Sequence, residues 1–494
     1  MDYRRYSRLT IAFHIWGVLK FFFFAFLYLF IFNREADWIG YGRIIAAILL
    51  ILSIIFVIFK WLTTTYKIDE VAFYLREGFF TKHKRTIPFS KVQNVNRHTT
   101  FLHKLIGKTS LKFETGMSGE GGTIKFEVLS KEEADHLEDW IEKSTRNIKV
   151  SEGEEEKVEE YIEDRKLHFA ASKKDIIKAS MTSLSFLLLI PALGSLFFMI
   201  NDFINVEKEA EGAIHFILSA WWLTALVVIF LIVASTIFGM IKTYIKYGNY
   251  RIYSDVDRIY ISRGVLDEVS FSISKEKVQA VEITQTLMKR ILRIAEVRLT
   301  SAGQTGGGGG DSSMETSSLF PFLPQKDAFR LISEILPDYE VEEEMHKLPK
   351  NALFARLLKP SWLWIIATAL LYYFQPNVLN MNIPWWLFSL LVLILVVLLR
   401  FLDYYNSRYV LNERFIQLKT GSLATTLFLT RRDKVIEIEM NRGPLEKILG
   451  IAKITTINRA QPVRHTHMYG VPESFRLAFY QWYKKRGSEI ELKQ

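Results

Sequence analysis

The sequence predicts a multi-pass α-helical membrane protein in which three helical hairpins, six spans in all, carry three water-soluble β-rich modules. Six long apolar segments occur as three pairs, and charged stretches of roughly a hundred residues follow each pair. One pattern of tyrosine, glycine and valine recurs after every pair. The hydrophobic fraction of 49% is high for a soluble protein and is concentrated in these blocks, which favours membrane spans over a large soluble core.

The six spans are expected at about 11–33 and 43–62, 180–200 and 214–241, and 361–373 and 383–402. A hydrocarbon core ~30 Å thick needs roughly 20 helical residues, and the fifth segment is the weakest because Pro376 cuts it short. The first apolar stretch is too long for a cleavable signal peptide and lacks a small-residue cleavage site, so we expect a retained span. Lys20 is the one clear interior cation, and without acidic residues in the apolar cores an ion-coupled transporter is disfavoured.

The charges beside the spans predict their orientation. The loop around Glu209 is acidic and the loop 375–382 is uncharged, whereas Arg4, Lys67, Lys246 and Arg408 flank the opposite ends of the spans. Cytoplasmic loops carry an excess of Lys and Arg, so we expect both termini and all three modules in the cytoplasm, at the cell membrane.

Composition and motifs argue against an enzyme. The absence of Cys excludes disulfides, thiolate nucleophiles and Cys-ligated metals. The run Gly303–Ser313 lacks the Lys-Ser or Lys-Thr of a phosphate-binding loop, and His465 with His467 lacks a third metal ligand. We therefore predict no catalytic residue, no metal and no cofactor. The net charge of +10 is attributed to membrane topology, with the lipid bilayer rather than nucleic acid as the partner.

An internal repeat carries the domain assignment. In each copy the Val lies 14 residues after the Gly, and a corner position lies 15 residues after the Val. Alternating apolar residues before each Gly predict a strand that enters a turn with φ > 0, and the Val predicts the start of another strand. The repeat positions are Tyr66, Gly78, Val92 and Gly107; Tyr250, Gly264, Val278 and Arg293; and Tyr409, Gly421, Val435 and Gly450.

Helical patterns at 132–143, 325–336 and 472–485 close the three copies. The predicted organisation is hairpin 1 at 1–65, module 1 at 66–146, a charged linker at 147–175, hairpin 2 at 176–249, module 2 at 250–337, a linker and hairpin 3 at 338–408, and module 3 at 409–494. The acidic stretch Glu152–Glu160 is a solvated linker or a docking site for a basic partner.

Over nearly its whole length this pattern resembles the bacterial pleckstrin-homology (PH)-like membrane family, specifically its large members with three modules. The resemblance implies that each PH-like module is a seven-stranded, strongly bent antiparallel sheet capped by a C-terminal helix, and that the protein is not an enzyme. It also implies a smaller membrane protein with one PH-like module as partner. The second copy departs from the pattern because Arg293 occupies the corner and two extra residues precede Gly264.

The first module carries a cationic strip, which suits either anionic lipid headgroups or a general positive-inside flank. Its residues are Lys82, Lys84, Arg85, Lys91, Arg97, Lys104 and Lys108. Two functions follow from the repeat and the resemblance. The first is a non-enzymatic membrane scaffold or adaptor whose three modules bind a membrane partner protein, an anionic lipid surface or both. The alternative is an envelope-protection or export component that gives resistance to a membrane-active compound such as an antimicrobial peptide.

Overall fold

The computed structural model describes residues 3–31, 38–69, 71–78, 81–115, 123–151, 165–182, 221–301, 318–375, 384–460 and 462–488. It divides into two compact units, Met1–Ser274 and Lys275–Gln494, and each is described by itself. The acidic loop around Glu209, the stretch 152–160 and the glycine-rich run 303–313 lie outside the described residues, as does nearly all of the predicted span 180–200.

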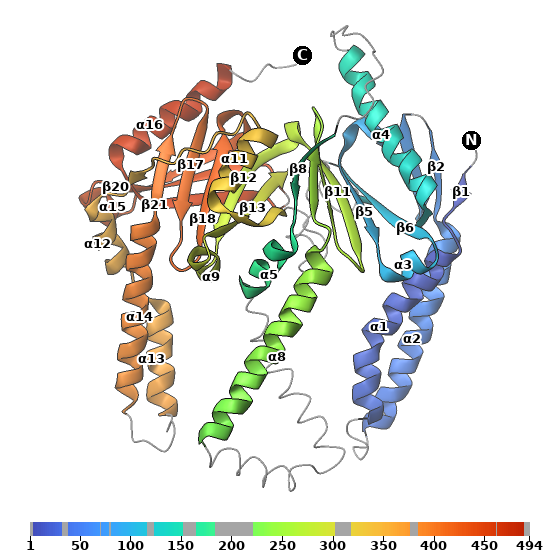
Figure 1. The fold of residues 1–494 in the computed structure, drawn as a ribbon, viewed down its shortest axis with the longest axis horizontal. Coiled ribbons are helices and arrows are strands. Elements are labelled where there is room, and N and C mark those ends of the chain that lie inside the picture. Colours follow the sequence, from blue (N-terminus) through green and yellow to red (C-terminus); the bar gives the residue numbers. More distant parts are fainter. Residues whose placement is uncertain are drawn as a thin grey trace. The chain divides into compact units, whose positions relative to one another are not determined.

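Within the described residues, each copy of the repeat contributes seven strands, and the first of them precedes the hairpin (Figure 1). The first copy has β1 (Arg4–Arg5), β2 (Thr65–Ile68), β3 (Ala72–Glu77), β4 (His83–Pro88), β5 (Val92–Thr99), β6 (Lys108–Thr115) and β7 (Thr123–Ser130). The second has β8 (Lys166–Ala170), β9 (Arg251–Ser254), β10 (Arg258–Arg263), β11 (Glu268–Ser274), β12 (Val278–Gln285), β13 (Ile294–Ser301) and β14 (Ser318–Pro324). The third has β15 (His346–Lys347), β16 (Arg408–Leu411), β17 (Phe415–Thr420), β18 (Thr425–Arg431), β19 (Val435–Asn441), β20 (Ile451–Asn458) and β21 (Arg464–Pro472).

The apolar helices are α1 (Leu9–Ile31), α2 (Trp38–Thr63), α8 (Trp221–Tyr247), α13 (Trp362–Phe374) and α14 (Trp385–Asn406). Shorter helices α5 (Lys173–Thr182) and α12 (Lys350–Leu358) precede the second and third hairpins. Among the described residues, three stretches are long and apolar enough to cross a membrane: Gly40–Thr63, Lys350–Phe374 and Trp385–Asn406. The described apolar part of α1, Leu9–Phe23, is shorter.

Strand pairing ties both ends of each hairpin to one sheet. The strand before the hairpin pairs antiparallel with the strand after it, in the pairs β1 with β2, β8 with β9, and β15 with β16. The segment predicted as a charged linker at 147–175 and the segment predicted as a linker and hairpin 3 at 338–408 therefore contain module strands, β8 and β15. Because neighbouring strands lie about 4.8 Å apart, the start of α1 and the end of α2 lie close together.

The modules share their sheets. One seven-stranded sheet runs β7-β6-β5-β11-β10-β9-β8, and another runs β14-β13-β12-β18-β17-β16-β15. A four-stranded sheet, β1-β2-β3-β4, and a three-stranded sheet, β19-β20-β21, complete the set. The family resemblance implied seven strands within each module, and the strand count agrees, but each seven-stranded sheet takes three strands from one module and four from the next. The chain leaves one sheet after β4, β11 and β18 and enters another within four residues, through a short 3-10 turn.

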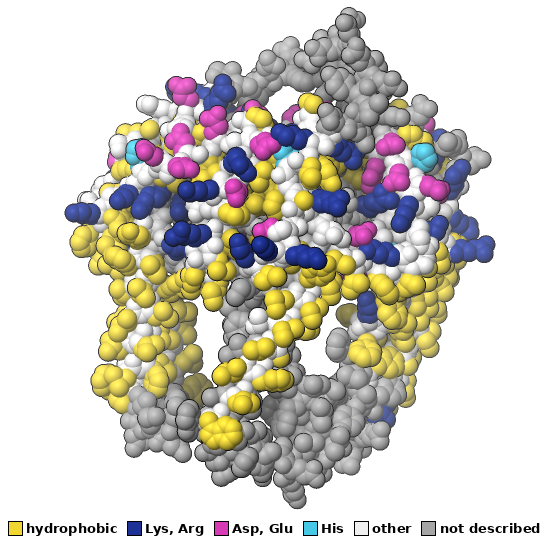
Figure 2. Space-filling view, viewed as in Figure 1, with side chains coloured by type: hydrophobic (Ala, Val, Ile, Leu, Met, Phe, Trp, Pro, Cys, Tyr) yellow, Lys and Arg dark blue, Asp and Glu magenta, His cyan; other side chains and the backbone are white. Residues whose placement is uncertain are grey.

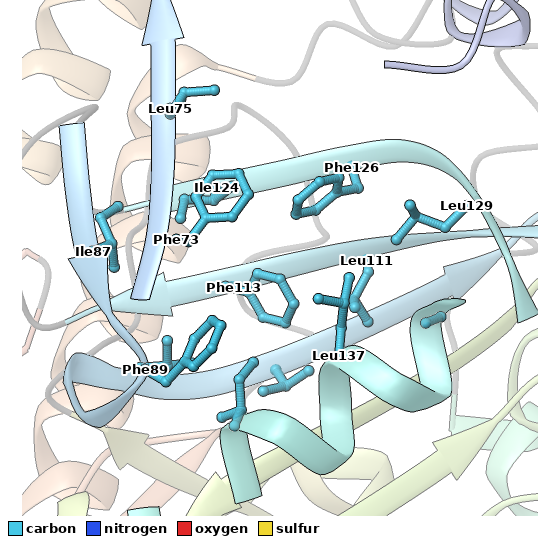
Figure 3. Packing of buried hydrophobic residues seen from close by; sticks show 14 residues of the cluster. Phe73, Leu75, Ile87, Phe89, Leu111, Phe113, Ile124, Phe126, Leu129 and Leu137 are labelled. Atoms are coloured by element: carbon cyan, nitrogen blue, oxygen red, sulfur yellow. The ribbon is translucent and has the colours of Figure 1, made fainter. Parts of the chain in front are cut away.

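The core of the first module lies between the four-stranded sheet and β5–β7, under helix α4 (Lys131–Ser151) (Figure 3). Phe73, Phe113 and Phe126 are fully buried, and each such ring contributes roughly 1.5–3 kcal/mol. The third module has a corresponding core capped by α16 (Glu473–Lys484), and α11 (Gln325–Ile335) is the matching helix of the second copy. The three predicted closing helices are thus confirmed.

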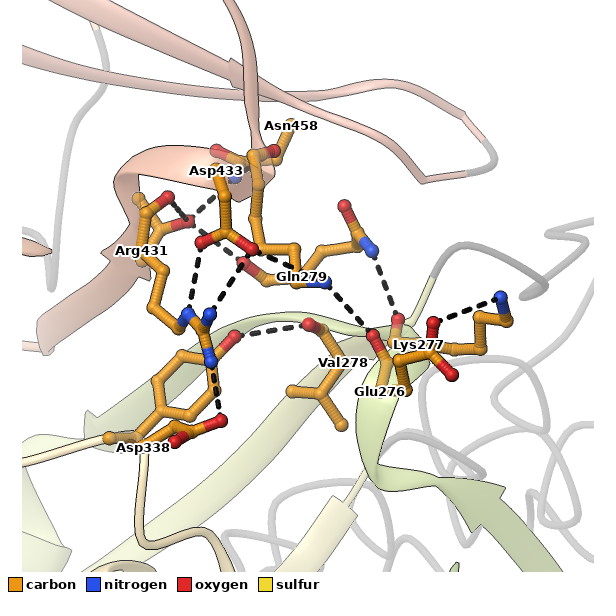
Figure 4. A network of polar contacts seen from close by, with 11 residues as sticks. Glu276, Lys277, Val278, Gln279, Asp338, Arg431, Asp433 and Asn458 are labelled. Carbon is orange, nitrogen blue, oxygen red and sulfur yellow. Dashed lines mark hydrogen bonds and ion pairs between the residues drawn. The ribbon is translucent and has the colours of Figure 1, made fainter. Parts of the chain in front are cut away.

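A polar network supports the junction between β12 and β18 (Figure 4). Arg431 is held between Asp433, at 2.9 Å, and Asp338, at 2.5 Å. The Tyr339 hydroxyl donates to the Val278 carbonyl at 3.0 Å, and burial raises the pKa of this phenol. Thr430 donates to the carbonyl of Gln279 at 2.8 Å. Because Tyr339 and Thr430 are buried and have partners, a strand shift here would leave their hydroxyls unsatisfied.

The turn glycines occupy the backbone conformation predicted for them, and the corner glycines, for which no conformation was predicted, also have positive φ. Gly78, Gly264 and Gly421 have φ between 103° and 121°, and Gly107 and Gly450 have φ of 64° and 67°. Arg293, at the same corner of the second copy, has φ of 54°. The left-handed conformation costs a residue with a Cβ roughly 1–2 kcal/mol, so the corner imposes its geometry even on arginine.

We expect Arg293→Gly to stabilise the second unit by about 1 kcal/mol, because glycine adopts the left-handed conformation without that cost. Gly421→Ala should destabilise it, since a Cβ there would lie 2.0 Å from the Ala424 carbonyl oxygen. Thermal unfolding of the purified protein in detergent, followed by tryptophan fluorescence, compares both variants with the wild type. A lower midpoint for Arg293→Gly would contradict the strain at this corner.

Candidate membrane-surface site

In each module the chain reverses direction through one short helix, which follows the strand that begins at the repeat Val. We call this the corner helix. The three corner helices are α3 (Phe101–Leu105), α9 (Leu287–Ile291) and α15 (Pro444–Ile448). The side chains of Thr100 and Thr286 cap the first two by accepting a backbone N–H two residues into the helix, and Gly443 with Pro444 begins the third. Each helix ends two residues before the left-handed corner position described above.

The corner helices expose an aliphatic side chain at one repeated position. Leu105, Ile291 and Ile448 each lie 13 residues after the repeat Val and are 68%, 67% and 82% exposed. Further exposed apolar residues accompany them: Phe101, Leu102 and Ile106 on the first corner, and Leu287 and Leu292 on the second. A threefold repeated exposed aliphatic residue is not explained by the core of its own module, and clustered exposed apolar side chains mark a binding surface.

The corner helices lie where apolar helices end. The Phe13 ring near the start of α1 stacks on His103 of α3 at 4.2 Å. Arg290 of α9 donates to Asn406, the last residue of α14, at 3.1 Å. Asn351 of α12 donates to the Leu449 carbonyl at the end of α15, at 3.0 Å. The exposed aliphatic residues are therefore at the level at which the chain passes from helix to sheet.

Aromatic and basic residues mark the same level. The Trp61 indole, near the end of α2, donates to the Tyr6 carbonyl at 3.0 Å, and tryptophan is enriched at membrane interfaces. Figure 2 shows Lys and Arg side chains gathered where the apolar helices of each unit meet its strands. Basic residues on or beside the corners include Lys104 and Lys108 in the first copy, Lys289, Arg290 and Arg293 in the second, and Lys447 in the third.

The cationic strip predicted for the first module is distributed over several elements. Lys82 precedes β4, Lys84 and Arg85 lie in β4, Lys91 ends the following 3-10 turn, Arg97 lies in β5, Lys104 in α3 and Lys108 in β6. Three of these cations have acidic partners at 2.5–2.8 Å: Arg85 with Glu77, Arg97 with Asp135, and Lys104 with Glu268. Lys104 and Lys108 lie at the corner, whereas Arg97 lies under α4.

Sequence reasoning missed the exposed aliphatic residues of the corners. It used these segments only to align the copies and assigned no function to Leu105, Ile291 or Ile448. The signal was available, because the three positions are equivalent and apolar and each stands one or two residues before a chain reversal. A core position would more often lie within a strand or a longer helix.

A polar recess of about 390 Å³ lies in the first unit, between α4 and strands β5, β10 and β11. Glu138 lines it, 3.9 Å from the Arg97 guanidinium. Burial raises the pKa of Glu138 to about 7, against the opposing pull of Arg97. This carboxyl therefore titrates near neutral pH.

Comparisons with known proteins agree with the repeated architecture. A family model for the bacterial PH domain matches three times, at residues 17–145, 192–338 and 361–486. The chain is similar to the UPF0699 transmembrane protein YdbT of Bacillus subtilis (strain 168), with 22% identity over 431 residues that cover 85% of each chain. No solved structure gives a significant match.

We expect the stability advantage of Glu138→Gln over the wild type to grow as the pH rises from about 5 to about 8. A raised pKa in the folded state stabilises the protein at low pH, and that contribution is lost as the pH passes through about 7. Glutamine stays neutral and avoids the loss. Unfolding midpoints across this pH range measure the difference.

Glu133→Gln is the matched control on the same helix. The Ser130 backbone N–H lowers the pKa of Glu133, so its stabilising contribution is present throughout this pH range. The control should show a constant deficit. A parallel trend for both variants would contradict the assignment to Glu138.

Proposed function

The chain belongs to the bacterial PH-domain family of membrane proteins, and we propose that it is a non-enzymatic adaptor whose modules rest on an anionic lipid surface. One observation carries this proposal. An aliphatic residue at the same repeat position is exposed on all three corner helices. Each corner helix lies beside the end of an apolar helix and has basic residues nearby. Aliphatic tips that enter the interface, with cations at the headgroups, are the chemistry of peripheral contact with an anionic leaflet.

The magnitudes suit orientation rather than anchoring. Each cation near an anionic leaflet contributes about 1 kcal/mol, and a fully buried Leu or Ile side chain contributes roughly 1.5–3 kcal/mol. Apolar helices already hold the chain in the membrane, so these terms need only fix how each module stands on it. Three such contacts on one chain act together because each raises the effective concentration of the others. An adaptor needs this, since its partner-binding surfaces must face a defined direction.

The adaptor proposal includes a cytoplasmic orientation at the cell membrane and six spans. Support comes from the basic residues at the sheet ends of the helices: Arg4 and Arg5 in β1, Lys67 in β2, Lys246 in α8 and Arg408 in β16. The excess of such residues is characteristic of cytoplasmic flanks. The proposed partner is a smaller membrane protein with one PH-like module, as the family resemblance implied.

The lipid contact can be tested with single cysteines, because the chain has none of its own. Leu105→Cys, Ile291→Cys and Ile448→Cys are labelled with an environment-sensitive dye in the full-length protein in bilayers. We expect blue-shifted emission and quenching by acyl-chain quenchers, both stronger in anionic than in neutral bilayers. Lys447→Gln should remove the dependence on anionic lipid at residue 448.

Leu477→Cys supplies the control. Leu477 is also exposed, at 49%, but lies on α16, away from α13 and α14 in Figure 1. Its dye should report water in both bilayers. If the dyes at residues 105, 291 and 448 report water in both bilayers, as the dye at residue 477 should, the proposed lipid contact is wrong.

The orientation has its own test. We expect an impermeant maleimide to leave Leu477→Cys unmodified in intact cells and to modify it after the membrane is permeabilised, because module 3 lies inside. Modification in intact cells would place this module outside and overturn the cytoplasmic assignment.

A further inference from the structure

Among the described residues, two strands at sheet edges lack the neighbour that the repeat gives to their equivalents. Strand β11 of the second copy pairs with β5 of the first, and β18 of the third pairs with β12 of the second. The corresponding strand of the first copy, β4, is the last strand of its sheet among the described residues, and so is β19 of the third copy. Within the described residues, β4 and β19 therefore each lack the neighbouring strand that their equivalents have in the other copies.

The two existing junctions share one register. In both, the residue two places after the repeat Val pairs with the residue five places before the next repeat Val. These pairs are Asn94 with Ile273 and Ala280 with Thr430. Applied to the open edges, this register pairs Glu437 with Ile87, Ile438 with Thr86 and Glu439 with Arg85.

The open edges carry opposite charges. Strand β19 presents Glu437 and Glu439, both exposed, and β4 presents Lys84 and Arg85. Arg85 is paired with Glu77 on β3, and the shared register sets Glu439 directly opposite it as a second carboxylate. Opposed charges on neighbouring strands contribute roughly 0.2–1 kcal/mol and fix the register. Like charges also keep each edge from pairing with its own kind, which is how exposed edges avoid unspecific association.

The corner helices also connect one copy to the next. Lys104 donates to the Val265 carbonyl, and Arg290 donates to the Ser422 carbonyl, each in the glycine turn of the next copy. Both cations lie 12 residues after the repeat Val, and the third such position is Lys447, which is exposed. The turn that it would meet in the same way is the glycine turn of a first module.

One pair at the end of the register is unfavourable. Arg442 comes opposite Lys82, two like charges. Arg442 is bound by Glu473 at 3.1 Å within its own module, and Lys82 is exposed at the entrance to β4. The cost falls at the solvated end of the strands, where screening is strongest, and not at the central pair of Glu439 and Arg85.

We propose that β19 of one copy pairs with β4 of a second copy of this chain, extending the sheets head to tail in the plane of the membrane. The partner is a second copy because both halves of the junction are present in this sequence, with matching register and opposite charge. The interface is heterologous: it uses different surfaces on the two chains, so repetition gives closed rings or open rows. The proposal goes beyond the lipid contact, and its tests use residues of β19 and β4, which the lipid contact does not involve.

Cross-linking between two distinguishable copies tests the proposal. One full-length copy carries Ile438→Cys and one tag, and the other carries Thr86→Cys and another tag. They are expressed together, and membranes are treated with a mild oxidant. Directly opposite residues have Cβ atoms about 4.5–5.5 Å apart, close enough for a disulfide after small adjustment. We expect a cross-linked species that carries both tags.

His465→Cys replaces Ile438→Cys in the matched control. His465 is also exposed but lies on β21, at the other edge of the same sheet. Cross-linking to Thr86→Cys should be several-fold weaker. Equal cross-linking from both edges, no cross-link at all, or capture of a smaller protein in place of the second copy would overturn the proposal. So would a disulfide that forms only when one chain carries both Ile438→Cys and Thr86→Cys.

Charge reversal provides a second readout. With the cysteine pair retained, Glu439→Arg in one copy should lower the yield several-fold, because it places like charges opposite each other. Adding Arg85→Glu to the other copy should restore the yield. If Arg85→Glu does not restore the yield, Glu439 and Arg85 are not paired at the junction. The dye experiments on the corner helices would be unaffected by this result.

Discussion

Antiparallel pairing between strands of consecutive modules is the interaction on which the rest of this molecule depends. Strand β5 has β6 of its own module on one side and β11 of the next on the other. The main-chain hydrogen bonds of a ladder are satisfied only when both neighbours are present. The polar side chains on these strands are also matched: Asn94 and Asn96 donate to Glu114 of β6. A module is therefore not an independent domain, because some of its strands form a sheet together with strands of the neighbouring module.

The shared sheets also explain how the helices and the sheets are coupled. Each hairpin is inserted between two neighbouring strands, so the ends of its helices are fixed by ladder hydrogen bonds and not by flexible linkers. The glycine turn of a module then lies against the end of its last apolar helix. Gly264 donates to the Gly248 carbonyl after α8, and the Gly421 N–H donates to Asp403 of α14. The corner helix of the preceding module donates to this same turn through Lys104 or Arg290, which sets its exposed aliphatic residue near the end of that apolar helix.

Sequence reasoning recovered what is local and periodic. The spacing of Gly, Val and corner identified three copies, and the need for φ > 0 identified the turns at Gly78, Gly264 and Gly421. The left-handed conformation of the corner, which Arg293 also adopts, was not predicted. Sequence reasoning missed the first strand of each module. Strands β1 and β15 have only two residues and show no alternation, and β8, with five residues, lies in a segment that was predicted to be a charged linker. It also missed the exchange of strands between modules. Alternation of apolar and polar residues indicates which face of a strand is buried. Which strand pairs beside it depends on the direction that the chain takes after a turn of three residues, and no pattern within the strand encodes that direction.

Sheet sharing has a consequence for how the protein is made. Strand β5 leaves the ribosome well before β11, which is synthesised only after α8, and at 5–20 residues per second the interval is roughly ten to thirty seconds. During that time β5 presents an unpaired edge of the kind that templates aggregation. The first module can complete its sheet only when a later apolar segment has been threaded into the bilayer, so maturation of the soluble part is paced by the insertion machinery. Misassembly of the nascent chain is then most sensitive to delays at the second hairpin.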